Sequence, residues 1–573
     1  MGNDHLRKFI NYLTIICFIL FCSFINNKKG IAADEVNMSQ EEMNSILQKI
    51  NELENRIHNI KINEKLEDTT TDIENDIENI ESEIEEVSDI LQVVEKKSFV
   101  DAIELGAEIL TRFDWFTFDG HDFFSFSEEQ KGDILHERVR MLPSNRLRIN
   151  LVSKITNKLN FHSRLVMYKN WADDDYPVFP ISNFLNKSRI PSDIHLNVER
   201  AYVDYFFKIF DKYQMAFTFG RLPTTDGFPT NFREDTVRKS TYPSLAYDVE
   251  ADGFGLTIDL NKITFFPKSS LRLVYLRRYD DNEQYRSGNR LTYKEGKFRI
   301  DENAESTYSV YIAQLETGLG NLISDSLFII NLNYMPKAPS QDFRDDDRLY
   351  PFYYDDTKII YVDSPDSLAQ GCKLTLFLES QNILNSGIDF FAGYGKTKTF
   401  GEGSIKFMFN PKPLGLPGEP VLARYAYSKY KTLIDNFPTF EPLLKDLQSA
   451  PPPIGILNYG DSDTEGEAFH VGMRFTFPFK ILHNLKFGIE YNRGSRYWLG
   501  FSNGSEDPLK KLTTRGKVWD MYLIQPINKY LKIRAGFTLT KQEFDQGLGF
   551  YFGEPLSIDH DVNNSYFLID ARF

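Results

Sequence analysis

The densest group of charged residues lies in one stretch, VERAYVDYFFKIFDKYQMAFTFGRLPTTDGFPTNFREDTVR, at residues 198–238. Two strand-like segments in this stretch are followed by a loop that proline and glycine punctuate. Acids and bases that face each other across a water-filled lumen create a transverse field, which selects solutes by charge and dipole. The same groups could instead form salt bridges that only brace a wall, because buried ionic groups need partners. The residues concerned are Arg200, Asp204, Arg221, Asp226 and Arg233.

One motif suggests covalent chemistry. Residues 500–504 match GxSxG, the nucleophile elbow of α/β-hydrolases, with Ser502 as the nucleophile. Asp559 and His560 follow in the chain order of a catalytic triad. The elbow requires a strand–turn–helix unit, whereas this segment is a Gly/Ser-rich loop between two strand-like segments. We therefore do not expect an enzyme.

The sequence gives no firm metal or cofactor site. Residues 461–466 resemble the start of a calcium loop, but Gly472 occupies the position of the bidentate glutamate. The histidines are scattered and form no HExxH pair, and no CxxCH haem motif or P-loop occurs. No basic stripe suggests nucleic acid. We expect no cofactor.

From about Val100 onward, polarity alternates with period two, as in a strand that has one apolar face. Leu147, Ile149 and Leu151, for example, alternate with polar residues. Charged residues opposite the apolar face, or in the loop that follows, are expected to line a lumen. These pore-lining candidates are Arg146, Arg148, Arg164, Arg200, Asp204, Arg221, Asp226 and Arg233.

The composition favours a membrane barrel. Beyond the N-terminal segment there is no apolar run of about 18 residues, the length that a helical span needs. Aromatic residues make up 14% of the chain, and barrels use such residues as interfacial girdles. We therefore predict an all-β transmembrane β-barrel of about 16–18 antiparallel strands, preceded by an N-terminal α-helical coiled coil.

Strand candidates recur along the rest of the chain, with a short turn at Thr156 to Lys158 and long loops elsewhere. The Pro-rich connection 411–466 should be a lid or an inward-folded constriction, and no inserted soluble domain is expected. The candidates are 103–115, 146–151, 159–168, 196–207, 213–221, 251–260, 270–279, 306–317, 326–335, 372–381, 387–398, 403–410, 421–430, 467–479, 484–493, 515–525, 530–541 and 564–573.

The last ten residues, NSYFLIDARF, place Phe567, Ile569, Ala571 and Phe573 on one face at period two. This strand resembles the closing strand of bacterial outer-membrane β-barrels. The resemblance implies that the C-terminal Phe serves as an outer-membrane assembly signal, recognised by the barrel-assembly machinery.

The N-terminus predicts export. Arg7 and Lys8 precede an apolar run, and the small residues Ala32 and Ala33 follow it. We expect a signal peptide over residues 1–33, so that the mature chain keeps only Cys372 and forms no intrachain disulfide.

Residues 34–98 combine an acidic composition with a heptad pattern. Nineteen acidic and six basic residues occur there, so the net charge of −16 belongs mostly to this segment. Isoleucine at both seam positions favours three or more helices, which predicts a parallel trimer in the periplasm. A helical hairpin remains the alternative. The seam is Met43, Ile46, Ile50, Leu53, Ile57 and Ile60, then Ile73, Ile77, Ile80, Ile84, Val87, Leu91 and Val94.

Three stretches carry a family resemblance: SRLVMYKNW (163–171), RAYVDYFF (200–207) and GRLPTTDGFPTNFRED (220–235). They resemble a family of uncharacterised bacterial outer-membrane proteins, a domain of unknown function whose members are taken to be porins. More loosely, a coiled coil before a barrel resembles trimeric sugar- and phosphate-specific porins.

We therefore predict a homotrimeric outer-membrane channel for passive diffusion of small hydrophilic solutes. Its domains would be 1–33 (signal peptide), 34–98 (acidic periplasmic coiled coil) and 99–573 (barrel). Its partners would be outer-membrane lipids and, through the coil, peptidoglycan. Two alternatives stay open: a structural tether from the outer membrane to the cell wall, and a barrel sheath for a periplasmic cytochrome.

Overall fold

The computed structural model describes residues 103–120, 135–170, 196–209, 213–262, 264, 266–278, 290–294, 297–301, 308–320, 325–338, 359–363, 365, 367–434, 441–450, 452–478, 484–502, 507–545 and 553–573. The predicted signal peptide (1–33) and coiled coil (34–98) lie outside these residues. Among the described helices, none is both long and apolar enough to cross a membrane.

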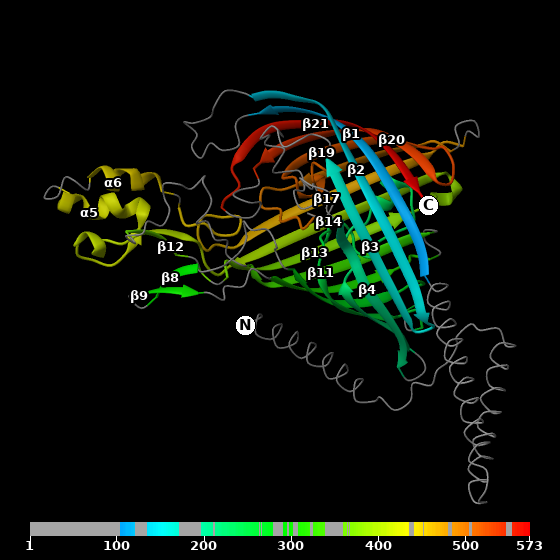
Figure 1. Cartoon of the computed structure of the whole chain (residues 1–573), viewed down its shortest axis with the longest axis horizontal. Helices are drawn as coiled ribbons and strands as arrows, with labels where there is room; N and C mark the ends of the chain where they lie inside the picture. The colour runs from blue at the N-terminus through cyan, green and yellow to red at the C-terminus, as the bar shows by residue number, and fades with distance from the viewer. Residues whose placement is uncertain are drawn as a thin grey trace, which may run out of the picture. The chain divides into compact units, whose positions relative to one another are not determined.

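Sixteen strands of the described chain form one closed antiparallel barrel, in the order β1-β2-β3-β4-β5-β6-β7-β10-β11-β13-β14-β17-β18-β19-β20-β21 (Figure 1). The predicted fold class is confirmed, at the lower of the expected strand numbers. The strands are β1 (Ile103–Gly120), β2 (Leu135–Thr156), β3 (Leu159–Asn170), β4 (Leu196–Ile209), β5 (Tyr213–Arg221), β6 (Asp252–Asp259), β7 (Ser270–Arg278), β10 (Tyr308–Thr317), β11 (Ser326–Ala338), β13 (Ala369–Ser380), β14 (Ile388–Gly401), β17 (Thr464–Thr476), β18 (Lys486–Gly494), β19 (Gly516–Pro526), β20 (Leu531–Phe544) and β21 (Ser557–Arg572).

The C-terminal strand closes the barrel. β21 pairs with β20 on one side and with β1 on the other, where Phe567 lies opposite Phe113. The Phe573 backbone N–H donates to the Ala107 carbonyl at 2.9 Å, which ties the end of the chain to β1. Phe567, Ile569 and Ala571 alternate with buried residues and therefore face outward.

Long and short connections lie at opposite ends of the barrel. The turn between β2 and β3 is the short one that the sequence predicts at Thr156 to Lys158. The connections after β1, β3, β5, β7, β11, β14, β18 and β20 are the long ones, and antiparallel pairing puts them all at the end away from the C-terminus. This asymmetry is typical of outer-membrane barrels.

An aromatic row on the outer face indicates the membrane boundary. Phe219, Phe254, Tyr275, Tyr311 and Tyr334 lie in register on the consecutive strands β5, β6, β7, β10 and β11. The ring centroids of Phe254 and Tyr275 are 5.2 Å apart, and those of Tyr275 and Tyr311 are 5.3 Å apart. Barrels place such girdles where the hydrocarbon layer meets the headgroups.

Charged side chains begin two residues beyond this row, toward the long loops. Arg221, Asp252 and Arg277 lie in register there, and the Nε of Arg221 is 3.6 Å from a carboxylate oxygen of Asp252. The change from aromatic to charged residues within two positions on the same face is the change that a bilayer surface requires.

A folded segment, here called the cap, lies between β14 and β17 at residues 402–463. It holds β15 (Lys406–Phe409), η7 (Lys412–Leu414), β16 (Val421–Leu422), η8 (Ala423–Tyr425), α5 (Ala426–Ile434), α6 (Glu441–Asp446) and η10 (Leu447–Ser449). β15 pairs with β16 and with β12 (Ile360–Asp363), and the helices lie at the end of the barrel opposite to the C-terminus (Figure 1).

The cap corrects two sequence predictions. Its apolar core includes Phe407, Phe409 and Leu444 and continues into Met335 and Ala369 of the wall strands β11 and β13. The candidate 403–410 forms a strand, but it belongs to the cap, because a small sheet packed on helices shows the same period as a lipid-facing one. The candidate 421–430 is mostly helical: its buried Ala423, Ala426 and Tyr430 follow a helical spacing.

The remaining described elements are short. They are α4 (Thr230–Glu234), the hairpin of β8 (Arg290–Lys294) and β9 (Lys297–Asp301), η6 (Ile383–Asn385) and η12 (Lys511–Thr513).

Candidate functional site

The connection between β5 and β6, residues 222–251, folds into the barrel and is here called the lumen loop. It contains the one-turn helix α4 and two residues with left-handed backbone, Asp226 (φ 57°) and Asp235 (φ 47°). Aspartate tolerates this conformation better than most residues, because its short side chain bonds locally. The loop contacts inward-facing residues on strands around the whole barrel wall, so it crosses the lumen.

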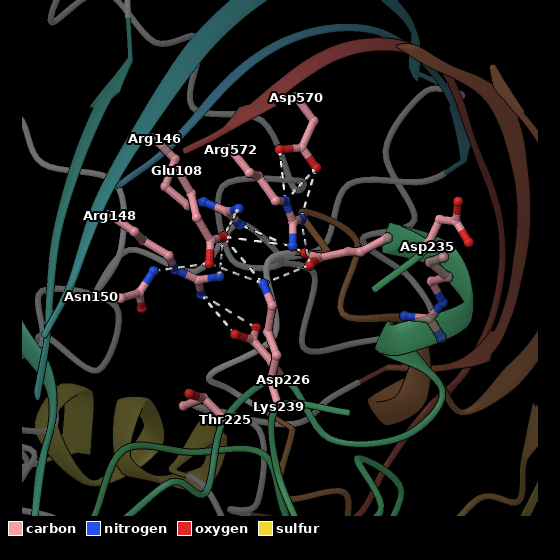
Figure 2. Close-up of polar contacts among 12 residues, drawn as sticks. Glu108, Arg146, Arg148, Asn150, Thr225, Asp226, Asp235, Lys239, Asp570 and Arg572 are labelled. Carbon is pink, nitrogen blue, oxygen red and sulfur yellow. Dashed lines mark hydrogen bonds and ion pairs between the residues drawn. The ribbon is translucent and has the colours of Figure 1, made fainter. Parts of the chain in front are cut away.

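Asp226 lies among three arginines of the wall, of which Figure 2 shows Arg148. Its Oδ2 is 3.0 Å from Nη2 of Arg148 and 2.9 Å from Nη1 of Arg164. Arg200 approaches the same oxygen at 3.3 Å and also donates to the Thr225 carbonyl at 2.6 Å. One loop carboxylate thus joins β2, β3 and β4.

Glu199 shares in this arrangement from β4. Its Oε2 is 2.9 Å from Nε of Arg148, and its Oε1 accepts a hydrogen bond from the Thr225 hydroxyl at 2.8 Å. Arg148 and Glu199 are both 0% exposed. A buried pair of this kind is tolerated because each charge has more than one partner.

A second ionic group joins the loop to β1, β2 and β21 (Figure 2). Lys239 of the loop lies 3.1 Å from Glu108 and 2.9 Å from Glu234. Arg572 contacts Glu234 at 2.8 Å, and Arg146 contacts Glu108 at 3.4 Å. Basic and acidic side chains of the wall and the loop alternate here, so that each of these charged groups contacts at least one group of opposite charge.

A third group holds α4 against β17, β18 and β19. Arg233 donates to both carboxylate oxygens of Glu490 at 2.9 Å. Lys511 lies 3.0 Å from Glu490 and also contacts Asp520, while His470 Nε2 is 3.2 Å from Glu490. Both hydrogen bonds come from the Arg233 Nε–H, which the two oxygens share, and hydrogen bonds between ionised groups are stronger than those between neutral groups.

The end of α4 is fixed to the same side. Asp235 lies 3.1 Å from Arg474 and also contacts Lys486. Arg474 lies 2.6 Å from Asp389 on β14, and Arg534 of β20 donates to the Arg233 carbonyl at 2.8 Å. The carbonyl end of this short helix is therefore surrounded by cations, as its dipole favours.

Toward β11, β13 and β14 the loop contacts are mainly apolar. Phe228 packs on Phe377 with ring centroids 5.1 Å apart, and Phe232 packs on Phe391 at 5.7 Å. A second apolar cluster joins the loop to β7 and β10, and consists of Leu222, Tyr242, Ala246, Tyr247, Val249 and Ala251 against Val274, Leu276, Val310 and Ile312.

Three loop groups have shifted pKa values. Burial alone would raise the pKa of Asp226, but the charges of Arg148 and Arg200 hold it well below its usual range. Burial would likewise raise the pKa of Glu234, and Lys239 and Arg572 hold it well below the usual range. Burial outweighs the attraction of Glu234 and, with Arg572 nearby, lowers the pKa of Lys239 to about 8.

The structure brings six of the eight pore-lining candidates together at the lumen loop: Arg146, Arg148, Arg164, Arg200, Asp226 and Arg233, which are between 0% and 8% exposed. Asp204 also faces the lumen, outside this group, and its carboxylate accepts a hydrogen bond from the Thr218 hydroxyl at 2.5 Å. Arg221 lies on the outer face, because it pairs with Ala201, which stands on the face opposite to Arg200. The sequence pattern predicted that Arg221 faces the lumen, and this prediction is wrong: the register of the β4–β5 hairpin places Arg221 on the outer face.

Sequence reasoning missed the acidic partners on the wall, Glu108, Glu199 and Glu490, and the loop cation Lys239. Glu108 and Glu490 alternate with outward residues in their strands, so strand parity could have found them. No sequence signal marked Lys239, because its partners lie 131 residues away at Glu108 and five residues away at Glu234.

The residues of the GxSxG hypothesis do not converge. The Ser502 hydroxyl donates to the Ser244 carbonyl at 2.7 Å, in contact with the lumen loop. Asp559 and His560 point to opposite faces of β21, and the exposed Asp559 pairs with Lys541 at 3.0 Å. The calcium-loop hypothesis fails locally, since the strand β17 begins at Thr464. Among the described residues, no cluster of three or more His, Cys, Asp or Glu suits a metal.

A closed sixteen-stranded barrel with an aromatic outer girdle, whose lumen is crossed by the lumen loop, is a porin-like β-barrel of the outer-membrane type. The chain belongs to the family described as "Protein of unknown function (DUF3373)", whose model matches residues 137–314 and 374–570. The family resemblance seen in the sequence is thereby confirmed. None of the curated proteins matches this sequence.

Three solved structures are similar to this chain. OprB of Pseudomonas putida, in a structure at high pH, shares 10% identity, and the match covers 83% of this chain and 96% of that one with a TM-score of 0.42. OmpF of Salmonella typhi, in complex with daunomycin, shares 10% identity over 82% of this chain and 97% of that one, with a TM-score of 0.38. The outer-membrane channel DcaP of Acinetobacter baumannii shares 11% identity over 82% and 97%, with a TM-score of 0.36.

Proposed function

We propose that this barrel is an outer-membrane channel for the passive diffusion of small hydrophilic solutes. The observation that carries the proposal is the lumen loop, a folded segment held on the lumen axis by ionic contacts to opposite walls. A structural barrel without transport needs only a filled interior, which apolar side chains supply with less desolvation. Juxtaposed acids and bases instead make a field across the lumen.

In this mechanism the loop narrows the lumen and its charges sort the solutes that pass. Guanidinium groups of Arg148, Arg164 and Arg200 form the basic side, and Asp226 provides the opposing charge. A solute that exchanges its hydration shell for these groups loses little free energy, whereas an apolar solute gains none. Selectivity would then depend on the balance of charge near the loop.

The setting of the channel follows the sequence-based predictions. The signal peptide would direct export, the C-terminal strand ending at Phe573 would be recognised by the barrel-assembly machinery, and the acidic coil would lie in the periplasm. We propose a homotrimer, because the isoleucine seam of the coil favours three or more strands. Contact of the coil with peptidoglycan belongs to the same proposal.

Conductance of the purified, folded protein in a planar bilayer tests the function. We expect discrete steps in groups of three, and a change of ion selectivity in Arg200→Ala. Arg221→Ala is the matched control, because it removes the same side chain from the outer face of the neighbouring strand. An equal shift in both variants would contradict a selectivity filter at the loop.

A tether between the outer membrane and the cell wall is the second candidate. The depth of burial favours it, since Arg148, Glu199 and Thr225 are 0% exposed and the loop fills the space around them. Folded barrels that conduct no ions, together with outer-membrane detachment when residues 34–98 are deleted, would support the tether. Copurification of a multihaem cytochrome with a silent barrel would instead support the sheath.

A further inference from the structure

Lys373 is a buried lumen cation that the contacts of the lumen loop do not use. It lies on β13 on the same inward face as Phe377, and it is 2% exposed. Within the described part of the chain, its ammonium has no hydrogen-bond partner and no carboxylate. Lys511, a lumen lysine of similar burial, contacts both Glu490 and Asp520.

Two aromatic rings lie against the Lys373 ammonium. Its Nζ is 4.4 Å from the ring centroid of Trp498 and 5.3 Å from that of Phe501. The Trp498 ring is fixed, because its Nε1–H donates to the Leu512 carbonyl at 2.8 Å and the ring covers Gly395, where a Cβ would lie 2.5 Å from it. Cation–π contacts contribute about 2 kcal/mol when desolvated, less than the several kcal/mol that burial of an ion costs.

Polar atoms near Lys373 also lack partners. Asn333 lies opposite Lys373 in the strand register, and Thr375 is the next inward residue of β13. Asn333 Oδ1 and Thr375 Oγ1 are buried without a hydrogen bond in the described structure, and so is the hydroxyl of Ser244 in the lumen loop. Ser244 is placed on this side of the lumen by its carbonyl, which accepts from Ser502, the residue after Phe501. The Asn333 amide nitrogen donates to the Ala246 carbonyl at 3.4 Å, which brings the loop against this part of the wall.

These groups have the chemistry of a ligand site. An ammonium and two hydroxyls can donate to a carboxylate, and the Asn333 carbonyl oxygen can accept from a hydroxyl. A neutral polyol would satisfy the oxygen atoms but leave the ammonium unpaired, at the cost that an unpaired buried charge carries. A cation would be repelled by Lys373.

We propose that Lys373, Thr375, Asn333 and Ser244 bind a small hydroxycarboxylate beside Trp498 and Phe501. The inference deepens the proposed function, on which its transport role rests: the site is a resting position for such anions during passage through the lumen. The carboxylate accepts from the Lys373 ammonium, and the solute hydroxyl donates to Asn333 Oδ1. No bond is made or broken.

Fluorescence titration of the folded barrel in detergent tests the site without requiring conductance. Lactate is the probe, and glycerol is the uncharged comparison. We expect lactate to change the emission of Trp498 in a saturable way and glycerol to leave it unchanged. The signal should vanish in Trp498→Phe, which assigns it to this tryptophan among the four in the chain.

Lys373→Met removes the ammonium with little change of volume and should abolish the lactate response. Lys398→Met is the matched control, because Lys398 lies on the adjacent strand opposite Cys372, faces outward and pairs with Glu465 at 2.9 Å. Absence of a lactate response in the wild-type barrel, or an undiminished response in Lys373→Met, would overturn the proposal. The wild-type comparison of lactate with glycerol decides the matter even where a variant does not fold.

The binding result and the channel result are separable. A barrel that binds lactate but conducts no ions would support the proposed binding site and contradict the proposed channel. A different outcome is a barrel that conducts, but in which Lys373→Met and Lys398→Met have the same permeability to lactate and to chloride. That outcome would support the proposed channel and contradict a role of the site in transport. We expect Lys373→Met alone to lower the permeability of lactate relative to potassium.

Discussion

Two long connections leave the same end of this barrel and are stabilised in different ways. The lumen loop, residues 222–251, buries carboxylates and cations against the inner wall, as Asp226 does with Arg148. The cap, residues 402–463, buries apolar side chains of its own, with Ile405, Phe409 and Leu444 all 0% exposed. The first segment is held largely by ionic contacts to the wall, and the second by an apolar core that it shares with Met335 and Ala369 of the wall.

The difference follows from what each surface offers. Where the inner wall presents arginines and glutamates, the lumen loop brings complementary charge, and where it presents apolar residues, as on β7, β10 and β13, the loop is apolar too. An apolar segment such as the cap packs on itself and on the apolar residues Met335 and Ala369 of the wall, because apolar burial needs no specific partner. The length of a loop at the barrel mouth therefore does not predict whether the loop enters the lumen. The polarity and charge of its residues are the better indicator.

Removal of the lumen loop should have the largest effect. Replacement of residues 225–240 by a short Gly/Ser linker should raise single-channel conductance severalfold, because the segment that crosses the lumen is gone. Replacement of the cap residues 412–450 by a similar linker should change conductance far less. Equal effects of the two deletions would show that the cap controls passage as strongly as the loop.

Asp226→Asn should be the most disruptive single substitution in the loop. It leaves Arg148, Arg164 and Arg200 around a neutral amide, and loss of one partner from a buried ionic group costs about 3 kcal/mol. We expect noisier open-channel current and a shift of selectivity toward anions. Asp559→Asn, on the outer face, serves as the control and should change neither quantity.

Leu444→Ala tests the cap by itself. The side chain is 0% exposed in the cap core, and truncation of a buried leucine costs about 3 kcal/mol. Limited proteolysis should become faster between residues 402 and 463, while conductance and selectivity stay those of the wild type. A changed selectivity would mean that the cap and the lumen loop are coupled.

The smallest effect should be a pH dependence at Lys239. Its folded-state pKa of about 8 lies below the usual lysine pKa of 10.5, so the folded protein binds fewer protons than the unfolded chain between these values. This group therefore adds stability as pH rises through that window, with a slope of at most about 1.4 kcal/mol per pH unit. The free energy of unfolding, measured from pH 7 to 10, should show this slope in the wild type and not in Lys239→Met.

Acid should leave the loop attached. The pKa values of Asp226 and Glu234 lie well below their usual range, so both stay ionised as pH falls to about 4. Their contribution to stability is present above the unfolded pKa values and is lost only in stronger acid. Conductance that changes sharply between pH 7 and 5 would place the responsible group elsewhere.

Most of the barrel could be predicted from the sequence, because alternation of polarity is a local property of a strand. The closing strand near Phe567 and the turn at Thr156 to Lys158 lie where the pattern places them. The same pattern failed at 403–410 and 421–430, since a half-buried strand or a short helix in the cap shows similar spacing. Alternation of polarity at every second residue indicates that one face of a strand is buried, but it does not indicate which element covers that face.

The sequence by itself determined the fold class, the strand positions and the set of charged residues available to the lumen. Only the tertiary structure decided which of them meet: Asp226 joins Arg148 across 78 residues, and Arg233 joins Glu490 across 257. It also decided the face of Arg221, which depends on the register of one hairpin. Contacts over such separations are set by barrel closure and strand register, and neither leaves a local signal in the chain.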